Sequence, residues 1–202
     1  KISNVNNLTD ARYFAAREVD YIGYSMNTAE QGISGTTIKA ILEWVTGPAH
    51  ILEVSIEQLA DLAELHQRIQ PAFIQIPAFV TSAEVELLPA LPYIKEIVVA
   101  PDFTEEGLLE ELLEWKNLPV VFDFSKNGHF WSDLKAQNRV SFLQKMLFGK
   151  EIWLDIPFEP EQWPELSTTL NPFGLSIKSS GEEKVGYKSF DEMDELLDTL
   201  SA

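Results

Sequence analysis

Short apolar runs alternate along the chain with longer segments that carry charges. Eight of these runs have the length and composition of β-strands. They span Ile2–Val5, Tyr21–Ser25, His50–Ser55, Ala72–Ile76, Ile94–Ala100, Val120–Phe124, Glu151–Ile156 and Phe173–Ile177. Strands that alternate with helices pair in parallel, because each helix returns the chain to the edge where the previous strand began. The pattern therefore predicts a parallel sheet covered by helices.

The segments between the runs have the spacing of amphipathic helices. Two of them carry apolar residues at Leu59, Leu62, Leu65 and Ile69, and at Leu108, Leu109, Leu112 and Leu113. Three sequences have the form of a capping box, in which a hydroxyl and a carboxylate or amide bond the free amides of the first helical turn. These are Ser55–Gln58, Thr81–Glu84 and Ser189–Glu192, and each follows a predicted strand directly or after a short loop.

Eight such units in 202 residues correspond to a compact (β/α)8 TIM barrel, an α/β fold. We expect a single barrel domain over residues 1–202, because we find no linker, low-complexity segment or second domain in the sequence. The alternative is an open doubly wound sheet. Such a sheet normally binds a nucleotide through a glycine-rich turn after its first strand, and Asn4–Asn7 contains no glycine.

The amino-acid composition of the chain argues against several classes of binding partner. The net charge of -17 weighs against nucleic acid and against anionic membranes, because both would be repelled over the whole surface. No run approaches the roughly 18 apolar residues of a membrane span, and the first residues do not form a secretory leader, so a cytoplasmic protein is expected. The absence of cysteine removes disulfides, thiolate nucleophiles and cysteine metal sites.

Several motifs occur in the order found in one enzyme family. The chain begins Lys1-Ile2-Ser3-Asn4 and continues with Asn7-Leu8-Thr9-Asp10-Ala11, Asp20–Tyr24, Phe73–Ile76, Val121–Asp123, Pro172–Ile177, Ser179–Glu183 and Gly186–Lys188. Together these resemble the phosphoribosylanthranilate isomerases. The corresponding family patterns are KICG, N-L-x-D-A, D-x-I-G-F, V-V-Q-L, L-L-D, P-Y-G-V-D-V-S-S-G-V-E and G-x-K-D.

The resemblance implies an aldose–ketose isomerase of tryptophan biosynthesis that uses neither cofactor nor metal and acts as a monomer or homodimer on a phosphosugar-type substrate. In the family a phosphorylated aminoaldose opens its ring and becomes an aminoketose. This Amadori rearrangement needs one group to protonate the ring oxygen and another to remove a proton from the sugar carbon. The corresponding positions are Asp123 for the acid and Ser3 for the base. Phosphate and substrate contacts are expected from Ser179, Ser180, Gly181, Asn4 and Gln75.

Three features differ from the family pattern. Ser3 replaces a cysteine, and a serine hydroxyl works as a base only when a neighbour takes its proton. The seventh strand ends in Leu154-Asp155-Ile156-Pro157 where the family has A-G-G-L, and no arginine occurs in Ala29–Ile33. The alternative interpretation is therefore a diverged or inactive paralogue that binds another small molecule at the barrel mouth.

For His129, and for four carboxylates at strand ends, we favour interpretations that involve neither catalysis nor metal binding. His129 follows Asp123 on the expected catalytic side, and we interpret it as a solvated loop residue rather than a proton relay for Ser3. Glu53, Asp102, Asp123 and Asp155 lie at strand ends and together could hold a hard cation. Their spacing fits no metal motif, so hydrogen-bonded or solvated carboxylates are the favoured interpretation.

Overall fold

All eight predicted strand segments form strands in the computed structural model, which describes residues 1–27, 32–179 and 189–201. The strands are β1 (Ile2–Ser3), β2 (Tyr21–Ser25), β3 (Ala49–Glu53), β4 (Phe73–Ile76), β5 (Tyr93–Val98), β6 (Val120–Asp123), β7 (Ile152–Asp155), β8 (Gly174–Leu175) and β9 (Ile177–Lys178). The last predicted strand is thus divided into β8 and β9.

This divided strand closes the barrel. β8 pairs with β7, whereas β9 pairs with β1, and both pairings are parallel like the others in the sheet. Between them the N–H of Ser176 donates to the carbonyl oxygen of Leu154 over 2.8 Å. Because the two ends of the sheet meet in one segment, the predicted barrel is confirmed and the open doubly wound alternative is wrong.

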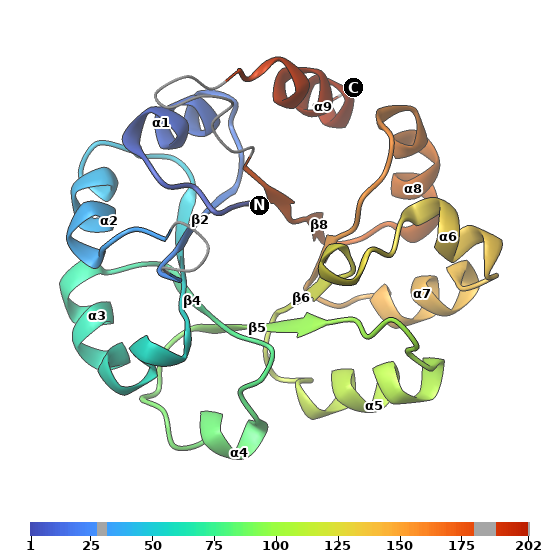
Figure 1. Cartoon of the computed structure of the whole chain (residues 1–202), viewed down its shortest axis with the longest axis horizontal. Helices are drawn as coiled ribbons and strands as arrows, with labels where there is room; N and C mark the ends of the chain where they lie inside the picture. The colour runs from blue at the N-terminus through green and yellow to red at the C-terminus, as the bar shows by residue number, and fades with distance from the viewer. Residues whose placement is uncertain (28–31, 180–188, 202) are drawn as a thin grey trace.

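The helices form a ring around the strands (Figure 1). They are α1 (Leu8–Ala16), α2 (Gly35–Leu42), α3 (Leu62–Ile69), α4 (Ser82–Val85), α5 (Glu105–Glu114), α6 (Trp131–Ala136), α7 (Val140–Leu147), α8 (Trp163–Leu170) and α9 (Asp191–Ser201). Short 3-10 turns occupy η2 (Ile56–Asp61), η3 (Ser125–Asn127) and η4 (Pro160–Gln162). No helix in the described ranges is long and apolar enough to cross a membrane.

Local sequence signals start these helices where predicted. Thr81 and Glu84 form a capping box before α4, with Thr81 N–H donating to Glu84 Oε2 over 2.8 Å. Ser55 forms the equivalent box before η2. At the third predicted start, the N–H of Asp191 donates to Ser189 Oγ over 3.2 Å. Each cap satisfies amides that the first helical turn leaves unpaired.

Contacts between α1 and α9 close the ring of helices beside the seam of the sheet. Tyr13 stacks on Phe190 with ring centroids 3.9 Å apart, and its hydroxyl donates to Asp194 Oδ1 over 2.6 Å. Arg17 forms ion pairs with Asp194 and Asp198. Figure 1 shows α9 next to α1 at this point. The two ends of the chain are therefore held together by side chains as well as by strand pairing.

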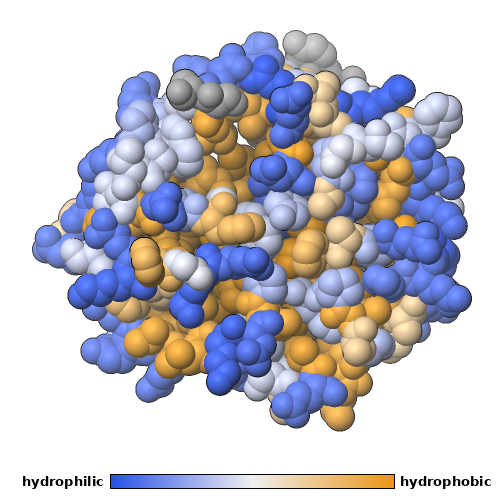
Figure 2. Space-filling view, turned by 180° about the vertical axis from the view of Figure 1, so that it is seen from behind, coloured by the Kyte–Doolittle hydropathy of each residue, from blue (hydrophilic) through white to orange (hydrophobic). Residues whose placement is uncertain are grey.

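The end of the barrel where the strands begin is mainly apolar. A cavity of about 440 Å³ lies there, lined mostly by aromatic and aliphatic side chains that include Trp153, Trp163 and Phe173. Figure 2, which shows the molecule from behind, has apolar residues around a hollow on this face. The polar candidate residues lie at the opposite end, where the strands finish.

Candidate active site

The inward-facing residues of the strands form an apolar floor with a polar layer above it. The floor consists of Ile51, Ile94, Val121 and Trp153, all buried inside the barrel. Side chains alternate between the two faces of a strand, so the next inward positions lie two residues further along. Those positions are Glu53, Glu96, Asp123 and Asp155. Strand periodicity alone therefore gathers four carboxylates at the barrel mouth.

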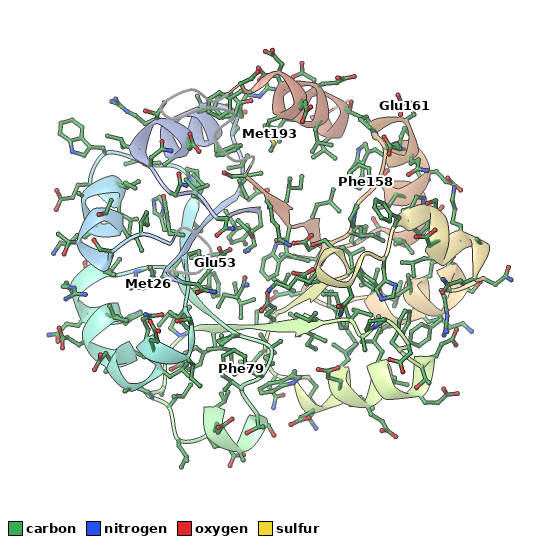
Figure 3. All side chains as sticks on the ribbon, viewed as in Figure 1. Met26, Glu53, Phe79, Phe158, Glu161 and Met193 are labelled. Carbon is green, nitrogen blue, oxygen red and sulfur yellow. The ribbon has the colours of Figure 1, made fainter. Side chains whose placement is uncertain are left out.

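A cavity of about 450 Å³ opens above this floor at the carboxyl ends of the strands. Four of the predicted site residues line it, namely Ser3, Asn4, Gln75 and Asp123. Figure 3 shows Glu53 and Phe79, which also line it, inside the ring of helices. The structure thus brings together most of the site that the motifs predicted.

The predicted phosphate contacts lie at the edge of the described region. Ser179 belongs to the seam of the barrel, where its N–H donates to the carbonyl oxygen of Ser3 over 2.9 Å. Within the described ranges it is not one of the cavity-lining residues. Ser180 and Gly181 lie outside the described residues. Their role in phosphate binding stays a prediction.

Ser3 lies in a buried cluster with a lysine that sequence reasoning missed. The Lys1 ammonium donates to Ser3 Oγ, to Glu53 Oε1 over 2.7 Å and to Ser176 Oγ over 3.4 Å. The Lys1 side chain is fully buried, and that of Glu53 is only 11% exposed. The Glu53 carboxylate thus balances the charge of the buried Lys1 side chain that contacts Ser3. Lys1 directly precedes β1 and is two residues from Ser3, and this alternation in an extended segment is the signal that could have identified the contact.

Backbone shape holds Glu53 in this cluster. Asn4 takes the left-handed conformation with φ of 62°, which asparagine tolerates better than most residues, and its N–H donates to Glu53 Oε2 over 3.1 Å. The Glu53 carboxylate also lies over Gly23, where an added Cβ would be only 2.1 Å from Oε1. Glycine at this position therefore leaves the space that the Lys1–Glu53 pair occupies.

We expect Gly23→Ala to destabilise the protein by about 2 kcal/mol, because the new methyl group displaces Glu53 from a buried ammonium. The measurement is the urea midpoint of unfolding. In a Glu53→Ala background the same substitution should cost much less, since the clashing carboxylate is gone. Equal costs in the two backgrounds would mean that Gly23 is needed for another reason.

Asp123 and Asp155 form a second cluster around Lys178. The Nζ of Lys178 lies 3.6 Å from Asp123 Oδ2 and 3.7 Å from Asp155 Oδ2. Asp123 Oδ1 accepts hydrogen bonds from Ser125 Oγ over 2.9 Å and from the N–H of Lys126 over 2.8 Å. The two aspartates are register partners on the adjacent strands β6 and β7. The two carboxylates thus share the Lys178 ammonium at the rim of the cavity, and Lys126 Nζ lies 3.7 Å from Asp123 Oδ2.

The two aspartates differ in their surroundings. Burial raises the pKa of Asp155 to about 6, with a further rise from the negative charge of Asp123, and Lys178 only partly opposes these effects. A carboxyl group with a pKa in this range can hold a proton close to neutral pH, as a general acid must. Asp155, which differs from the family pattern in the sequence, is therefore chemically suited to act as a general acid.

Gln75 presents an unused hydrogen-bond acceptor to the cavity. Its side chain is buried, at 9% exposure, and it lies at the carboxyl end of β4. Among the described residues, its Oε1 has no hydrogen-bond partner. A buried carbonyl oxygen without a donor is costly, so its presence beside the cavity favours a ligand that supplies an N–H or O–H group.

The loop after β4, which forms one wall of the cavity, is fixed by the buried side chain of Lys95. The Lys95 ammonium donates to the carbonyl oxygens of Pro77, Ala78 and Val80 over 2.7–2.8 Å. It also lies 4.6 Å from the ring centroid of Trp115. Burial lowers the pKa of Lys95 to about 8, so the ammonium remains the main form at pH 7. The loop that it holds carries Phe79, which lines the cavity.

His129 is not the solvated loop residue that the sequence predicted. It is only 8% exposed and packs against the rings of Phe103 and Phe124. Its Nε2 lies 2.9 Å from the carbonyl oxygen of Ala100, to which it donates. Within the described ranges His129 does not line the cavity. Its contacts explain a structural role and provide no path to Ser3.

The carboxylates at the mouth do not form a metal site in the described part of the chain, where no suitable group of three or more His, Cys, Asp or Glu residues occurs. Asp102 is exposed and does not line the cavity. The others face ammonium groups: Glu53 pairs with Lys1, and Glu96 accepts from Lys126 over 2.6 Å. The favoured interpretation of hydrogen-bonded carboxylates agrees with these contacts.

Comparison with solved structures identifies the same barrel in other proteins. The phosphoribosyl anthranilate isomerase from Thermotoga maritima matches with a TM-score of 0.79 and 16% identity, over 99% of this chain and 97% of that chain. N-(5'-phosphoribosyl)anthranilate isomerase from Pyrococcus furiosus matches with a TM-score of 0.73 and 16% identity, over 99% and 96%. No family sequence profile and no curated protein sequence matches the chain.

A third structure contains a bound molecule. It is a phosphoribosyl anthranilate isomerase in complex with reduced 1-(o-carboxyphenylamino)-1-deoxyribulose 5-phosphate, with a TM-score of 0.72 and 17% identity over 99% of this chain and 96% of that chain. At such identities the likeness concerns the fold. The predicted resemblance is confirmed at that level: this chain has the barrel fold of the phosphoribosylanthranilate isomerase structures.

Proposed function

We propose that the protein is an aldose–ketose isomerase that catalyses the Amadori rearrangement of N-(5'-phosphoribosyl)anthranilate or a close analogue. The observation that carries the proposal is the presence of two polar clusters in one cavity. One contains Asp123, at the position of the family's acid, and the other contains Ser3, at the position of its base. Ring opening and proton removal need a donor and an acceptor at separate points of one bound sugar.

The roles follow from the contacts of each residue. Asp123 donates the proton to the ring oxygen. Ser3 stands where a base is needed. It acts as the alkoxide that forms when its proton passes to solvent in the cavity, and the Lys1 ammonium that donates to Ser3 Oγ stabilises this negative charge. Gln75 and Asn4 contact the sugar, and the unpartnered Gln75 Oε1 accepts from a ligand hydroxyl or amine.

The substrate carries two further groups that the site must accept. Phe79, 59% exposed at the wall of the cavity, offers a surface for the aromatic ring. The phosphate is assigned to Ser179, Ser180 and Gly181, which match the Ser-Ser-Gly of the family's motif. This assignment follows the sequence motif and the position of the seam.

The first test is turnover of N-(5'-phosphoribosyl)anthranilate, followed by the loss of its fluorescence. We expect slow turnover by the wild type, and we expect Ser3→Cys to raise kcat about tenfold or more. The reason is that a thiol beside the Lys1 ammonium ionises far more readily than a hydroxyl. Ser132→Cys is the matched control, because Ser132 is exposed on α6 and does not line the cavity.

The competing candidate is a barrel that binds another small molecule without this reaction. The specific observation in its favour is that, in the described part of the chain, both lysines lining the cavity face carboxylates. A dianionic phosphate must therefore be bound by a cation outside this lining, or it must displace a carboxylate from one of these lysines. Absence of turnover in both wild type and Ser3→Cys would overturn the isomerase proposal and favour this candidate.

A further inference from the structure

We propose that Asp155 is a second catalytic acid, which shares one proton with Asp123 so that the two carboxylates act as a pair. This inference rests on the proposed isomerase function and adds a residue to it. The family pattern places no carboxylate at the end of the seventh strand, so the pair is a feature of this chain. The geometry and the charges around the two side chains carry the argument.

The fold fixes the two carboxyl groups next to each other. Asp123 and Asp155 are register partners at the ends of β6 and β7, and both face the cavity. The Nζ of Lys178 lies within 3.7 Å of an Oδ2 oxygen of each. Both side chains are buried, Asp123 at 2% and Asp155 at 8% exposure. Lys126 Nζ also lies 3.7 Å from Asp123 Oδ2 but pairs with Glu96 over 2.6 Å. The three carboxylates of Glu96, Asp123 and Asp155 therefore face two ammonium groups, and a single proton removes the excess negative charge.

The neighbouring groups decide where the proton resides. Oδ1 of Asp123 accepts from Ser125 and from the N–H of Lys126, whose ammonium also lies 3.7 Å from Oδ2. At Asp155 burial and the charge of Asp123 raise the pKa, and the Lys178 ammonium, a hydrogen bond with the Ser125 side chain and the charge of Lys1 oppose the rise without cancelling it. In the resting protein the proton is therefore held mainly by Asp155.

A second observation points to a ligand in this cavity. Gln75 lines the same space, and its buried Oε1 has no partner among the described residues. A sugar bound there would present its oxygen atoms to the carboxylates at the rim. The acid pair and the unpaired amide thus belong to one site.

The rearrangement transfers protons between substrate and protein without a net gain or loss. The pair gives its proton to the ring oxygen as the bond from that oxygen to C1 breaks, which leaves an iminium ion and two carboxylates. The base then takes the proton from C2 and forms the enolamine. When the enolamine becomes the ketone, the protonated base gives its proton to C1 and the 2-hydroxyl gives its proton to the pair. The pair and the base therefore return to their starting protonation states.

The test compares pH profiles of kcat/KM for phosphoribosylanthranilate in wild type and Asp155→Asn. In the wild type we expect kcat/KM to fall about tenfold per pH unit above about pH 6, because the pair loses its proton. In Asp155→Asn the like charge beside Asp123 is removed, so the site no longer favours a shared proton near neutral pH. The loss should therefore be small at pH 5 and about a hundredfold at pH 7.5. A loss of equal size at every pH would overturn the proposal.

Lys178→Met provides a change in the opposite direction. Without the shared ammonium the pair should hold its proton to higher pH, so the fall in kcat/KM should move upward. Asp102→Asn is the matched control, because Asp102 is exposed and lies outside the cavity lining. An Asp102→Asn profile that shifted as Asp155→Asn does would also overturn the assignment.

A measurement without substrate separates this inference from the proposed function. The raised pKa of Asp155 makes the folded protein less stable as pH rises from about 4 to about 6, because its ionised form is disfavoured in the fold. The Tm of Asp155→Asn should therefore rise relative to wild type between pH 4 and pH 7. No relative rise would overturn the proton-sharing pair. A relative rise without wild-type turnover would overturn the isomerase function, and the catalytic role with it, while the pair itself would stand.

Discussion

Asp123→Asn is expected to lower kcat/KM for phosphoribosylanthranilate about a thousandfold at pH 6. The amide can still accept the hydrogen bonds that Asp123 Oδ1 receives from Ser125 and from the N–H of Lys126. It cannot give a proton to the sugar. The fold should therefore survive while proton transfer from Asp123 is lost. Steady-state fluorescence and an unfolding curve on the same preparation measure the two properties together.

The matched control for this variant is again Asp102→Asn, which makes the same chemical change at an exposed position outside the cavity. It should retain wild-type kcat and KM. A wild-type kcat/KM in Asp123→Asn would remove Asp123 from the reaction and leave Asp155 as the carboxyl group to examine alone. A raised KM with unchanged kcat would instead assign Asp123 to substrate binding.

Replacing one member of the Lys1–Glu53 pair is expected to cost about 3–5 kcal/mol of stability. Glu53→Met leaves the fully buried Lys1 ammonium with only the hydroxyls of Ser3 and Ser176. Lys1→Met leaves the Glu53 carboxylate with only the N–H of Asn4. In each case an unpaired charge remains where little water can reach it. Urea unfolding of both variants at pH 7 measures the cost.

The double variant Lys1→Met/Glu53→Met is the decisive comparison. With both charges removed, no uncompensated ion is buried, and the loss should be much smaller than the sum of the single losses. If the double variant were as unstable as the sum predicts, then packing rather than charge would explain the cluster. Its fold could also be checked by the retained pairing of β1 with β9, which protects backbone amides from hydrogen exchange.

The alternation of apolar runs with amphipathic segments predicted the barrel because each element had a clear period and a start signal. Tyr21–Ser25 forms β2 with the predicted bounds, and α3 buries Leu62, Leu65 and Ile69 as the helical spacing required. The break between β8 and β9 was not predicted. A hydrophobic run gives no information about where a strand transfers its hydrogen bonds from one neighbour to the other.

Only part of the site was predicted from the sequence, because the motifs identify positions but not the contacts between them. Asp123, Ser3, Asn4 and Gln75 were placed at the mouth by their strands. Lys178 was missed because it lies one residue beyond the predicted strand, and its contacts with Asp123 and Asp155 cross from β9 to β6 and β7. Pairing over such a separation in sequence has no local signal.

The burial of His129 could not be predicted from its local sequence either. A histidine in a glycine-containing loop has the local sequence of an exposed residue. Its burial comes from Phe103, which belongs to the loop before α5, and from the carbonyl oxygen of Ala100. Neither contact could be inferred from the residues around position 129.

The three carbonyl oxygens around Lys95 resemble the oxygen ligands of a metal-binding loop, with an ammonium group in place of the ion. A bound ion would leave when its concentration fell, whereas this cation is covalently part of β5. The wall that carries Phe79 is consequently ordered before any ligand arrives, so binding does not pay the conformational entropy of folding that loop. Its rigidity is also independent of the ionic composition of the medium, and it comes from a β5 residue that is not among those lining the cavity.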